Sequence, residues 1–523
     1  MASDDSTLTL GPLDALTGSA RGLPLVPALT IIWHPDLDRV GEVAPLTALL
    51  ESVVAHVDRD HPIFFPPGSS AGQSLDHKRM HREPVVDLVF ARGKLELRRG
   101  RGGGEIEVDG RPFDKPRRIS ADDLRRGLIL TLARRFVFCL HSIRFPISRS
   151  PTLGLLGTSD AIEDVRRSIT RVAGKMTPVL LRGETGTGKE LAARALHDAG
   201  ARPGGPFIAV NMGALVRETA AADLFGYQKG AFTGATSDSP GHFRSAAGGT
   251  IFLDEIGLIP PDVQPTLLRV LDNHVVQPLG SSQARKVDVR VVAATDAKLE
   301  QAVTAGRFEP SLYHRLSSYF NIPITPLRER REDVGTLLVQ FLRSHFSDPA
   351  QLQRLHDPDP HAHPWLSARD VAAVALSSLS GNGRSLIELA RALVTESGDD
   401  PNGDTHSVIT DFLANDLLLS PRAPNSRPIQ KKPRADIEIT EERLLAALEK
   451  AGWNRARAAS SFKVARNTFW RWLCKYPDLR RLADIPTEDL LRDLQACAND
   501  VDKLATKLDV PANLIRRRLA GRR

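Results

Sequence analysis

A glycine-rich loop interrupts the chain between an apolar run at 179–181 and a helical pattern that begins at 191. It reads Gly183-Glu184-Thr185-Gly186-Thr187-Gly188-Lys189-Glu190. Glycines let consecutive backbone N–H groups curl around phosphate oxygens, and a helix N-terminus adds a favourable dipole. Lys189 supplies a positive charge for the β and γ phosphates. This order of strand, loop and helix predicts a parallel, helix-covered sheet that binds a nucleotide, with a ligand-free turn as the alternative.

A second apolar run, 249–253, ends in two adjacent carboxylates, Asp254 and Glu255. Strand ends of this kind meet the phosphates at the edge of a parallel sheet. Asp254 can hold Mg²⁺ through water, and Glu255 can polarise the attacking water. On its own such a run is more typical of a solvated strand end, but its distance from the glycine-rich loop favours catalysis. We therefore predict an ATPase with ATP and Mg²⁺ as cofactors.

The chain has 523 residues, which is too long for one hydrophobic core and suggests three or four units. Short apolar runs separated by turns predict a β-sandwich early in the chain, and prolines with basic residues predict a linker near 421–435. A constant offset of 46 residues between apolar positions, such as Leu444 and Leu490, indicates a helical repeat near the C-terminus. The expected boundaries are a flexible leader at 1–24, an N-terminal β-sandwich at 25–145, a central α/β P-loop domain at 152–330, a helical lid at 331–400, a linker at 401–435, an all-α helix-turn-helix at 436–480 and a second repeat at 481–523.

Composition narrows the location and the partners. The formal net charge of +7 permits nucleic-acid binding without requiring it. We expect no signal peptide, and no run approaches the ~18 apolar residues of a membrane span, so we expect a cytoplasmic protein without a membrane partner. Three widely spaced cysteines exclude a disulfide framework or a cysteine-based zinc site.

A hexapeptide between the two nucleotide motifs is the most specific signal in the sequence. It reads Gly230-Ala231-Phe232-Thr233-Gly234-Ala235 and matches the GAFTGA motif of sigma-54-dependent activators, also called bacterial enhancer-binding proteins. Glu190 and the text around 326–330 also resemble this family of AAA+ ATPases, and the resemblance covers about 152–397. A glycine-flanked surface turn is the alternative. The resemblance implies a ring-shaped homo-oligomer whose GAFTGA loop contacts sigma-54 RNA polymerase.

Further residues take their roles from this resemblance. Asn211 matches the residue that restrains the catalytic glutamate, here Glu255. Arg315 matches an arginine finger that reaches the neighbouring subunit's nucleotide, and Arg384 matches the lid arginine that senses the phosphate. Two positions depart from the family: Asp296 stands where an asparagine is usual and Glu309 where a second arginine is expected. An acid at 309 beside the neighbour's γ-phosphate would give a slow ATPase.

The two ends of the chain resemble known modules. The first C-terminal repeat resembles a helix-turn-helix of the factor-for-inversion-stimulation type, with Arg466, Asn467, Thr468 and Arg471 on the face that would read upstream DNA. A plain helical hairpin is the alternative there. The second repeat ends in the basic run 516–523, which suits either a second DNA-reading head or a helical appendage.

The N-terminal unit resembles a forkhead-associated domain. That resemblance implies a phosphothreonine protein as partner, gripped by Arg39 and Arg82. Asp109 replaces the expected asparagine, so a fold retained for intramolecular or subunit contacts is the alternative.

Together these features predict an ATP-dependent transcription activator that binds upstream DNA and remodels sigma-54 RNA polymerase into the open complex. The alternative is a DNA-binding regulator whose degraded ATPase serves as an oligomerisation scaffold. A generic AAA+ unfoldase or helicase agrees less well with the GAFTGA motif and the helix-turn-helix.

Overall fold

The structure is a computed structural model that divides into two compact units, 1–421 and 422–523. It describes residues 24–51, 54–91, 94–147, 150–296, 298–346, 364–397 and 404–419 of the first unit. In the second unit it describes 440–451, 487–497, 500–508, 510–520 and scattered positions between 453 and 485. The predicted leader and most of the predicted linker lie outside these residues.

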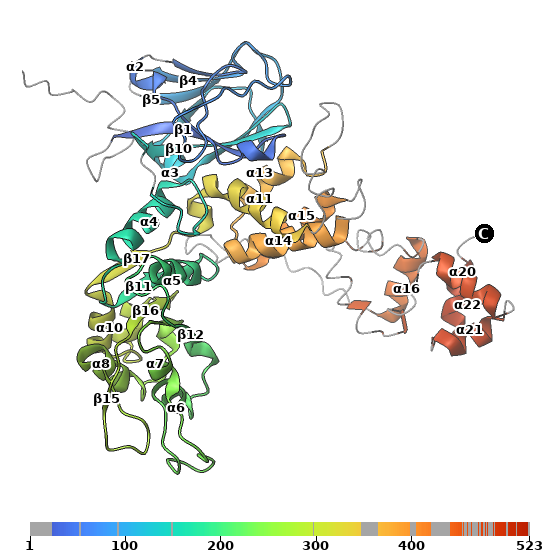
Figure 1. Cartoon of the computed structure of the whole chain (residues 1–523). Helices are drawn as coiled ribbons and strands as arrows, with labels where there is room; N and C mark the ends of the chain where they lie inside the picture. Colours follow the sequence, from blue (N-terminus) through green and yellow to red (C-terminus); the bar gives the residue numbers. More distant parts are fainter. Residues whose placement is uncertain are drawn as a thin grey trace, which may run out of the picture. The chain divides into compact units, whose positions relative to one another are not determined.

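The N-terminal part, blue in Figure 1, consists of two antiparallel sheets. One sheet has the order β2-β1-β10-β9-β6-β7, with β2 (Val43–Pro45), β1 (Leu25–Trp33), β10 (Phe136–Arg144), β9 (Leu128–Leu132), β6 (Ile106–Val108) and β7 (Arg111–Pro112). The other has the order β3-β4-β5-β8, with β3 (Val54–Val57), β4 (Val86–Ala91), β5 (Lys94–Arg99) and β8 (Arg117–Ile119). Side chains of both sheets share one core, so this part is a two-layer sandwich.

Strand β10 is apolar on both faces. Phe136, Phe138 and Leu140 point into the sandwich core, whereas Val137 and Cys139 belong to a second core on the outer face. Successive strand residues face opposite sides of a sheet, so an unbroken apolar run is what burial on both sides requires. The outer face is therefore covered by another part of the chain.

The central part is a parallel sheet of order β12-β13-β16-β11-β17. Its strands are β12 (Phe207–Asn211), β13 (Thr250–Asp254), β16 (Arg290–Thr295), β11 (Val179–Arg182) and β17 (Phe320–Pro323). The helices are α4 (Asp160–Val172), α5 (Lys189–Asp198), α6 (Ala220–Phe225), α7 (Gly241–Ser245), α8 (Gln264–Asn273), α9 (Leu299–Thr304) and α10 (Pro310–Ser317). Val179 and Leu181 of β11 belong to one core and Leu180 to another, so helices cover both faces of the sheet. The predicted P-loop fold is confirmed.

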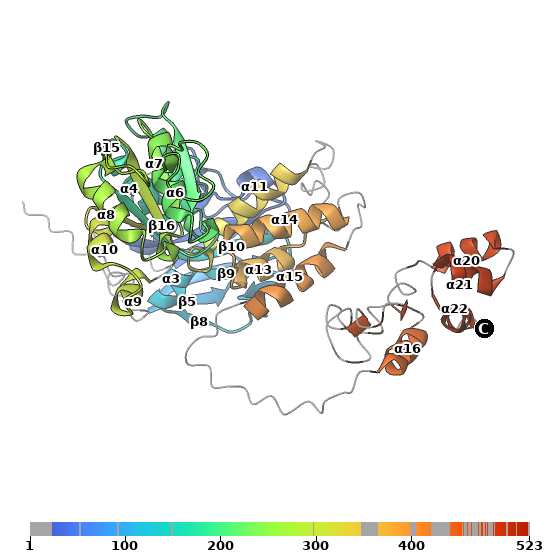
Figure 2. The ribbon, with the colours of Figure 1, turned by 90° about the horizontal axis from the view of Figure 1, so that it is seen from below.

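The helical lid consists of α11 (Val334–His345), α13 (Ala368–Leu376), α14 (Gly383–Ser397) and α15 (Thr405–Leu419). Of these helices, α13 contacts β9 and β10 and α11 contacts β1, and both lie against the sandwich in Figures 1 and 2. Together with Ile32, Ile129 and Val137 of the sandwich they form one apolar cluster. The lid is therefore what covers the outer face of the six-stranded sheet.

The predicted boundary between lid and linker was wrong. Helix α15 lies within the predicted linker 401–435, yet it buries Val408 and Ile409 in the lid core. The Asp416 carboxylate also accepts hydrogen bonds from the Leu379 and Ser380 backbone N–H groups, at 2.9 and 2.7 Å. Because a helix so held belongs to the packed domain, the lid extends to Leu419.

The C-terminal unit contains α16 (Glu441–Lys450), α20 (Thr487–Ala496), α21 (Val501–Leu508) and α22 (Ala512–Ala520). Leu444 and Leu490, equivalent positions of the predicted repeat, are both fully buried in one cluster, as are Phe469 and Ile515. The two repeats thus share a core. Arg466, Asn467, Thr468 and Arg471 lie outside the described residues, so their predicted role in reading DNA stays a prediction.

Among the described residues, no helix is long and apolar enough to cross a membrane.

Candidate nucleotide-binding site

The P-loop connects β11 to α5 at the carboxyl edge of the parallel sheet. Gly186 and Gly188 have φ angles of 78° and 101°, in the left-handed region that favours glycine. A Cβ atom at Gly186 would lie 2.0 Å from the Gly381 carbonyl oxygen, so the loop passes directly against the lid. Lys189 begins α5, and its ammonium donates to the carbonyl oxygens of Gly183 and Glu184 at 2.8 and 3.2 Å.

A cavity of about 460 Å³ opens beside this loop. Its polar side contains residues 185–190 of the loop together with Asn211, Asp254, Glu255 and Arg384, all of which the sequence predicted. Its apolar side contains Leu155, Leu156, Ile162, Leu327, Leu337, Phe341 and Ile387. A cavity with one polar wall and one apolar wall is suited to a ligand that combines phosphates with an aromatic base.

The two carboxylates lie where β13 ends. The Asp254 carboxylate accepts a hydrogen bond from the Glu255 backbone N–H at 3.0 Å, and Glu255 adopts a left-handed φ of 54°. β13 pairs with β12 so that Asp254 lies opposite Asn211, as the predicted restraint of Glu255 requires. The Asn211 side-chain oxygen, however, accepts from the Gly213 backbone N–H at 2.8 Å. Asn211 thus shapes the turn next to Glu255, since a Cβ atom at Gly213 would lie 2.7 Å from the Glu255 carboxylate.

Four polar residues that the sequence analysis did not single out support the site, and three of them hold the P-loop. Arg328 makes two hydrogen bonds of 2.6 Å to the Glu184 carboxylate, and these bonds hold the pKa of Glu184 below its usual value. The buried Asn382 donates to the Thr185 carbonyl oxygen at 3.0 Å, and its own oxygen accepts from Leu327 N–H at 2.8 Å. Arg330 donates to the Thr187 carbonyl oxygen at 3.3 Å. The sequence contained a signal for these residues, because Arg328 and Arg330 belong to the motif 326–330 and Asn382 belongs to the Gly-Asn-Gly of the lid.

The fourth of these residues, Asp333, is fully buried. Its carboxylate accepts from the backbone N–H groups of Thr158 and Ser159 at 2.6 and 2.8 Å, and from the Ser159 hydroxyl at 2.6 Å. Ser159 in turn caps α4 by accepting from the Ile162 N–H. Asp333 therefore fixes the beginning of the helix that carries Ile162 into the cavity.

Asp296 follows the end of β16. Its neighbour Thr295 lies opposite Arg182, and Thr295 accepts a hydrogen bond from Gly183 N–H, so Asp296 lies beside the P-loop. The Thr185 hydroxyl donates to the Asp296 carboxylate at 3.1 Å. An additional negative charge therefore lies next to the phosphate-binding loop, as the sequence predicted.

Arg315 lies on α10, in a different cavity from the P-loop residues, together with Asp272, His314 and Tyr319. It forms an ion pair with Asp272 at 3.0 Å and donates to the Tyr319 hydroxyl at 2.9 Å. A group that acts on its own chain's nucleotide would be expected beside the P-loop. Its separation from that cavity agrees with the predicted role toward a neighbouring subunit.

The GAFTGA hexapeptide forms a tight turn between α6 and α7. Gly230 and Gly234 have φ angles of 83° and 104°, and the Gly230 N–H donates to the Ala235 carbonyl oxygen at 2.9 Å. Phe232 is 42% exposed, although its ring meets Tyr227 edge to face. The turn therefore presents one large apolar side chain, Phe232, to solvent.

Of the two arginines predicted to bind a phosphate on the sandwich, only one is exposed. Arg39 is buried, and its guanidinium binds the Glu42 carboxylate at 2.8 Å and the Leu75 carbonyl oxygen at 2.9 Å. The expectation that Arg39 grips a phosphate is therefore wrong, because this guanidinium is already neutralised inside the domain. Arg82 is exposed. Asp109 shapes a turn, since its carboxylate accepts from the Ile129 N–H and pairs with Arg117.

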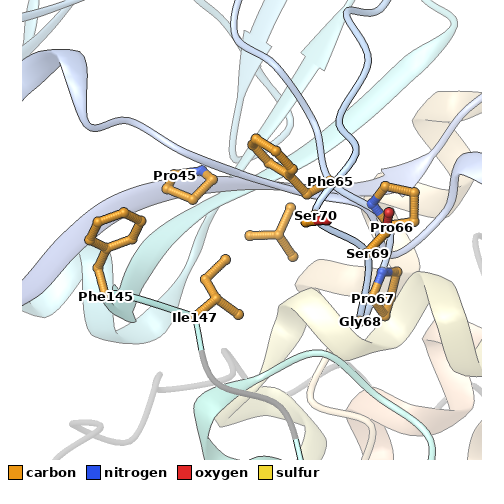
Figure 3. Close-up of a pocket in the computed structure, with 10 residues that line it drawn as sticks. Pro45, Phe65, Pro66, Pro67, Gly68, Ser69, Ser70, Phe145 and Ile147 are labelled. Atoms are coloured by element: carbon orange, nitrogen blue, oxygen red, sulfur yellow. The ribbon is translucent and has the colours of Figure 1, made fainter.

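A second cavity, of about 450 Å³, lies on the sandwich (Figure 3). Pro45, Phe65, Pro66, Phe145 and Ile147 surround it, and none of the described residues that line it is charged. Phe145 and Ile147 belong to the connection that leads from β10 to α4.

Comparison with known proteins agrees with this geometry. Residues 155–322 match the model of the sigma-54 interaction domain. The chain is 37% identical over 332 residues to the transcriptional regulatory protein ZraR of Klebsiella oxytoca, covering 62% of this chain and 69% of that one. The chain belongs to the sigma-54 activator family.

Other relatives of this sigma-54 activator are similar over a shorter length or at a lower identity. The regulator NtrC of Escherichia coli K12 is 48% identical over 193 residues, which cover 37% of this chain and 41% of NtrC. A crystal structure of NtrX from Brucella abortus in complex with ADP is 29% identical, with a TM-score of 0.45 and coverage of 62% and 69%. The match to the sigma-54 interaction domain contains the P-loop, both carboxylates and the GAFTGA turn, but not the sandwich, the lid or the C-terminal unit.

Proposed function

We propose that this sigma-54 activator hydrolyses ATP and uses the energy to remodel sigma-54 RNA polymerase into the open complex. The observation that carries the proposal is the joining, in one cavity, of the P-loop, Asp254, Glu255 and the lid residue Arg384. The exposed Phe232 turn supports contact with sigma-54.

The residues of the cavity fit a nucleoside triphosphate. Left-handed glycines leave the backbone N–H groups free to surround phosphate oxygens, and Lys189 would exchange its two carbonyl partners for the β and γ phosphates. Asp254 would hold Mg²⁺ through water, and Mg²⁺ would neutralise charge that develops on the phosphates. Among the described residues no group of three or more acidic, histidine or cysteine side chains could hold a metal alone. Phosphate oxygens and water would share in holding Mg²⁺.

Hydrolysis follows from the positions of the polar groups. Glu255 polarises the attacking water at the end of β13, and Arg384 contacts the phosphates from the lid. Arg315 acts in the nucleotide site of a neighbouring subunit, which requires a ring of identical chains. The turn at Phe232 and Thr233 changes posture when the γ-phosphate leaves and transmits this change to sigma-54.

The C-terminal unit would hold upstream DNA. Arg466, Asn467, Thr468 and Arg471 of the first repeat remain the proposed reading residues. Three described arginines of the second repeat have partners: Arg516 binds Asp502, Arg517 binds Glu449 and Arg518 donates to the Ile485 carbonyl oxygen. These contacts favour the second repeat as a helical appendage that packs on the first.

A regulator with a degraded ATPase is the second candidate. The observation that favours it is the bond from Thr185 to Asp296, which adds a negative charge beside the phosphates. On this reading the protein would still form a ring and bind DNA but would not turn over ATP.

Steady-state ATPase measurement separates these candidates. The parental protein should hydrolyse ATP, and Lys189→Ala should lose nearly all turnover while it keeps DNA affinity. Lys175→Ala is the matched control, because Lys175 is exposed over the Phe320 ring, outside the cavity. Parental turnover in Lys189→Ala would refute the site, and a folded parental protein without turnover would support the scaffold.

A further inference from the structure

Two helices carry part of the apolar wall of the nucleotide cavity. Ile162 belongs to α4, which follows Leu155 and Leu156, and Leu337 and Phe341 belong to α11. Both helices also contact the N-terminal sandwich. Each of them therefore connects the wall of the cavity to the sandwich.

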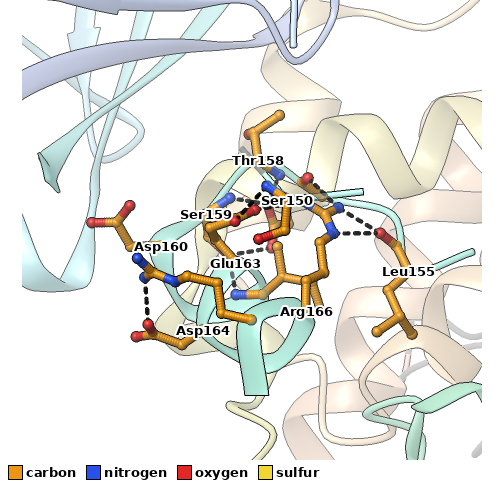
Figure 4. Close-up of polar contacts among 12 residues, drawn as sticks. Ser150, Leu155, Thr158, Ser159, Asp160, Glu163, Asp164 and Arg166 are labelled. Carbon is orange, nitrogen blue, oxygen red and sulfur yellow. Dashed lines mark hydrogen bonds and ion pairs between the residues drawn. The ribbon is translucent and has the colours of Figure 1, made fainter. Parts of the chain in front are cut away.

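Arg144, the last residue of β10, holds the first turns of α4. Its backbone N–H and side chain donate to the Asp160 carboxylate at 2.8 and 3.1 Å, and its guanidinium makes two bonds to Asp164 at 2.9 and 2.8 Å. The hydrogen bonds that Arg144 donates to Asp164 raise the pKa of Arg144 above its ordinary value. Figure 4 shows Asp160 and Asp164 on one side of α4, with Ser159 and Thr158 at its beginning. The sandwich thus grips α4 at two residues that lie on either side of Ile162 in the sequence.

The first turn of α11 lies directly against β1. A Cβ atom at Gly335 would lie 2.0 Å from the Ile32 carbonyl oxygen, and one at Gly41 would lie 2.7 Å from the Thr336 hydroxyl. Glycine inside a helix is about 1 kcal/mol less favourable than alanine, so Gly335 is explained by this close approach. Farther along, Arg343 forms an ion pair with Asp38 at 2.6 Å.

A short segment joins these contacts to the P-loop. Arg330 donates to the Thr187 carbonyl oxygen, Arg331 donates to the Gly127 carbonyl oxygen of the sandwich at 3.1 Å, and Asp333 holds Thr158 and Ser159. Consecutive residues therefore contact the nucleotide loop, the sandwich and the start of α4. The surrounding interface is mostly apolar and largely buried, as in a domain core.

We propose that the N-terminal sandwich is a fixed brace of the nucleotide site, in which Arg144 and the β1 surface around Ile32 position α4 and α11 and thereby set nucleotide affinity. Arg144 is a positioning residue, because it contacts α4 and not the nucleotide. A signal that acts on the sandwich would act on the ATPase through these two helices. The inference rests on the proposed function only in taking the cavity as the ATP site.

The test uses the full chain with Arg144→Ala. The Kd for ADP and the KM for ATP should rise about tenfold, while kcat at saturating ATP stays within about twofold, because the catalytic carboxylates lie on β13. Arg144→Lys should recover part of the affinity, since one ammonium can still pair with one aspartate. Arg134→Ala is the matched control, because Arg134 pairs with Glu105 within the sandwich.

Gly335→Ala gives a second, independent variant. Alanine has a higher helix propensity than glycine, but its Cβ atom would collide with the Ile32 carbonyl oxygen. Nucleotide affinity should therefore fall although the helix propensity of α11 rises. Ser344→Ala, on the exposed side of α11, should leave affinity unchanged.

Parental ADP affinity in folded Arg144→Ala and Gly335→Ala would overturn the brace. A loss of kcat in proportion to the loss of affinity would also overturn it, since that result indicates general damage. If the parental chain binds ADP without hydrolysing ATP, the proposed function fails, whereas the ADP affinities of the variants still decide the brace.

Discussion

At the scale of single residues, the structure places Glu309 at the start of a helix. It is exposed and stands at the N-cap of α10, where its backbone N–H donates to the Gln264 side chain. Six residues of helix correspond to about 600° of rotation, so Glu309 and Arg315 lie about 120° apart around the axis. A carboxylate at a helix N-terminus is also favourable for the helix dipole. The structure thus gives Glu309 a local role at the start of α10.

This setting changes the expected effect of substitution. Arg315→Ala should lose turnover by about 10³-fold or more, as expected for an arginine finger. Glu309→Arg should change turnover at saturating ATP by less than about twofold. The measurement is steady-state hydrolysis at protein concentrations that support a ring. A marked rise in turnover for Glu309→Arg would instead show that its carboxylate opposes catalysis.

The sequence predicted the residues that face the phosphates, but it did not predict the hydrogen bonds that hold the surrounding segments in place. Lys189, Asp254 and Glu255 follow apolar runs, so their meeting at one sheet edge could be predicted from strand order alone. Asn382 and Asp333 could not, because each bonds to backbone groups far away in the sequence. Arg39 shows the opposite error, since a neighbour three residues away, Glu42, had already neutralised it.

At the scale of elements, the apolar runs of β1, β9 and β10 indicate that both faces of these strands are buried. The run at 136–140 lacks the alternation of a half-exposed antiparallel strand, which indicates burial on both faces. Which partner covers the outer face could not be predicted, because the lid is distant in sequence. Helix α15 was missed as part of the lid for the same reason.

Substitutions in the two C-terminal repeats should affect DNA binding differently. Replacing Arg466 and Arg471 together with alanine should weaken specific binding by about 2 to 6 kcal/mol if both residues read base edges. Replacing Arg516 and Arg517 together should have a much smaller effect, because these arginines already pair with Asp502 and Glu449. Footprint titration compares the two variants. Equal losses would make the second repeat a DNA-reading head.

At the scale of the whole molecule, the interface between sandwich and lid should make stability depend on pH. Burial, together with the neighbouring Asp333, raises the pKa of Glu332 to about 8. The charged or titratable groups around Glu332 are His141, Cys139, Asp160, Arg330, Arg331 and Asp333. A carboxyl with a raised pKa favours the folded state fully at low pH and loses this contribution as pH rises toward 8.

The unfolding temperature of the full chain should therefore fall between pH 5 and pH 8 by more than it falls in Glu332→Gln. Glutamine keeps the shape of the neutral side chain and removes its titration. Glu329→Gln, at a 60% exposed side chain, is the control that should follow the parental curve. Identical pH dependence in the parental protein and Glu332→Gln would contradict this account.

Formation of open promoter complexes tests the central claim most directly. The assay contains the full-length protein, sigma-54 RNA polymerase, a supercoiled promoter with its upstream site, and ATP. We predict ATP-dependent opening by the parental protein, and for Thr233→Ala continued ATP hydrolysis without opening, because the turn that contacts sigma-54 is changed while the nucleotide cavity is not. A parental protein that hydrolyses ATP but opens no promoter, or a Thr233→Ala variant that opens promoters at the parental rate, would contradict the account.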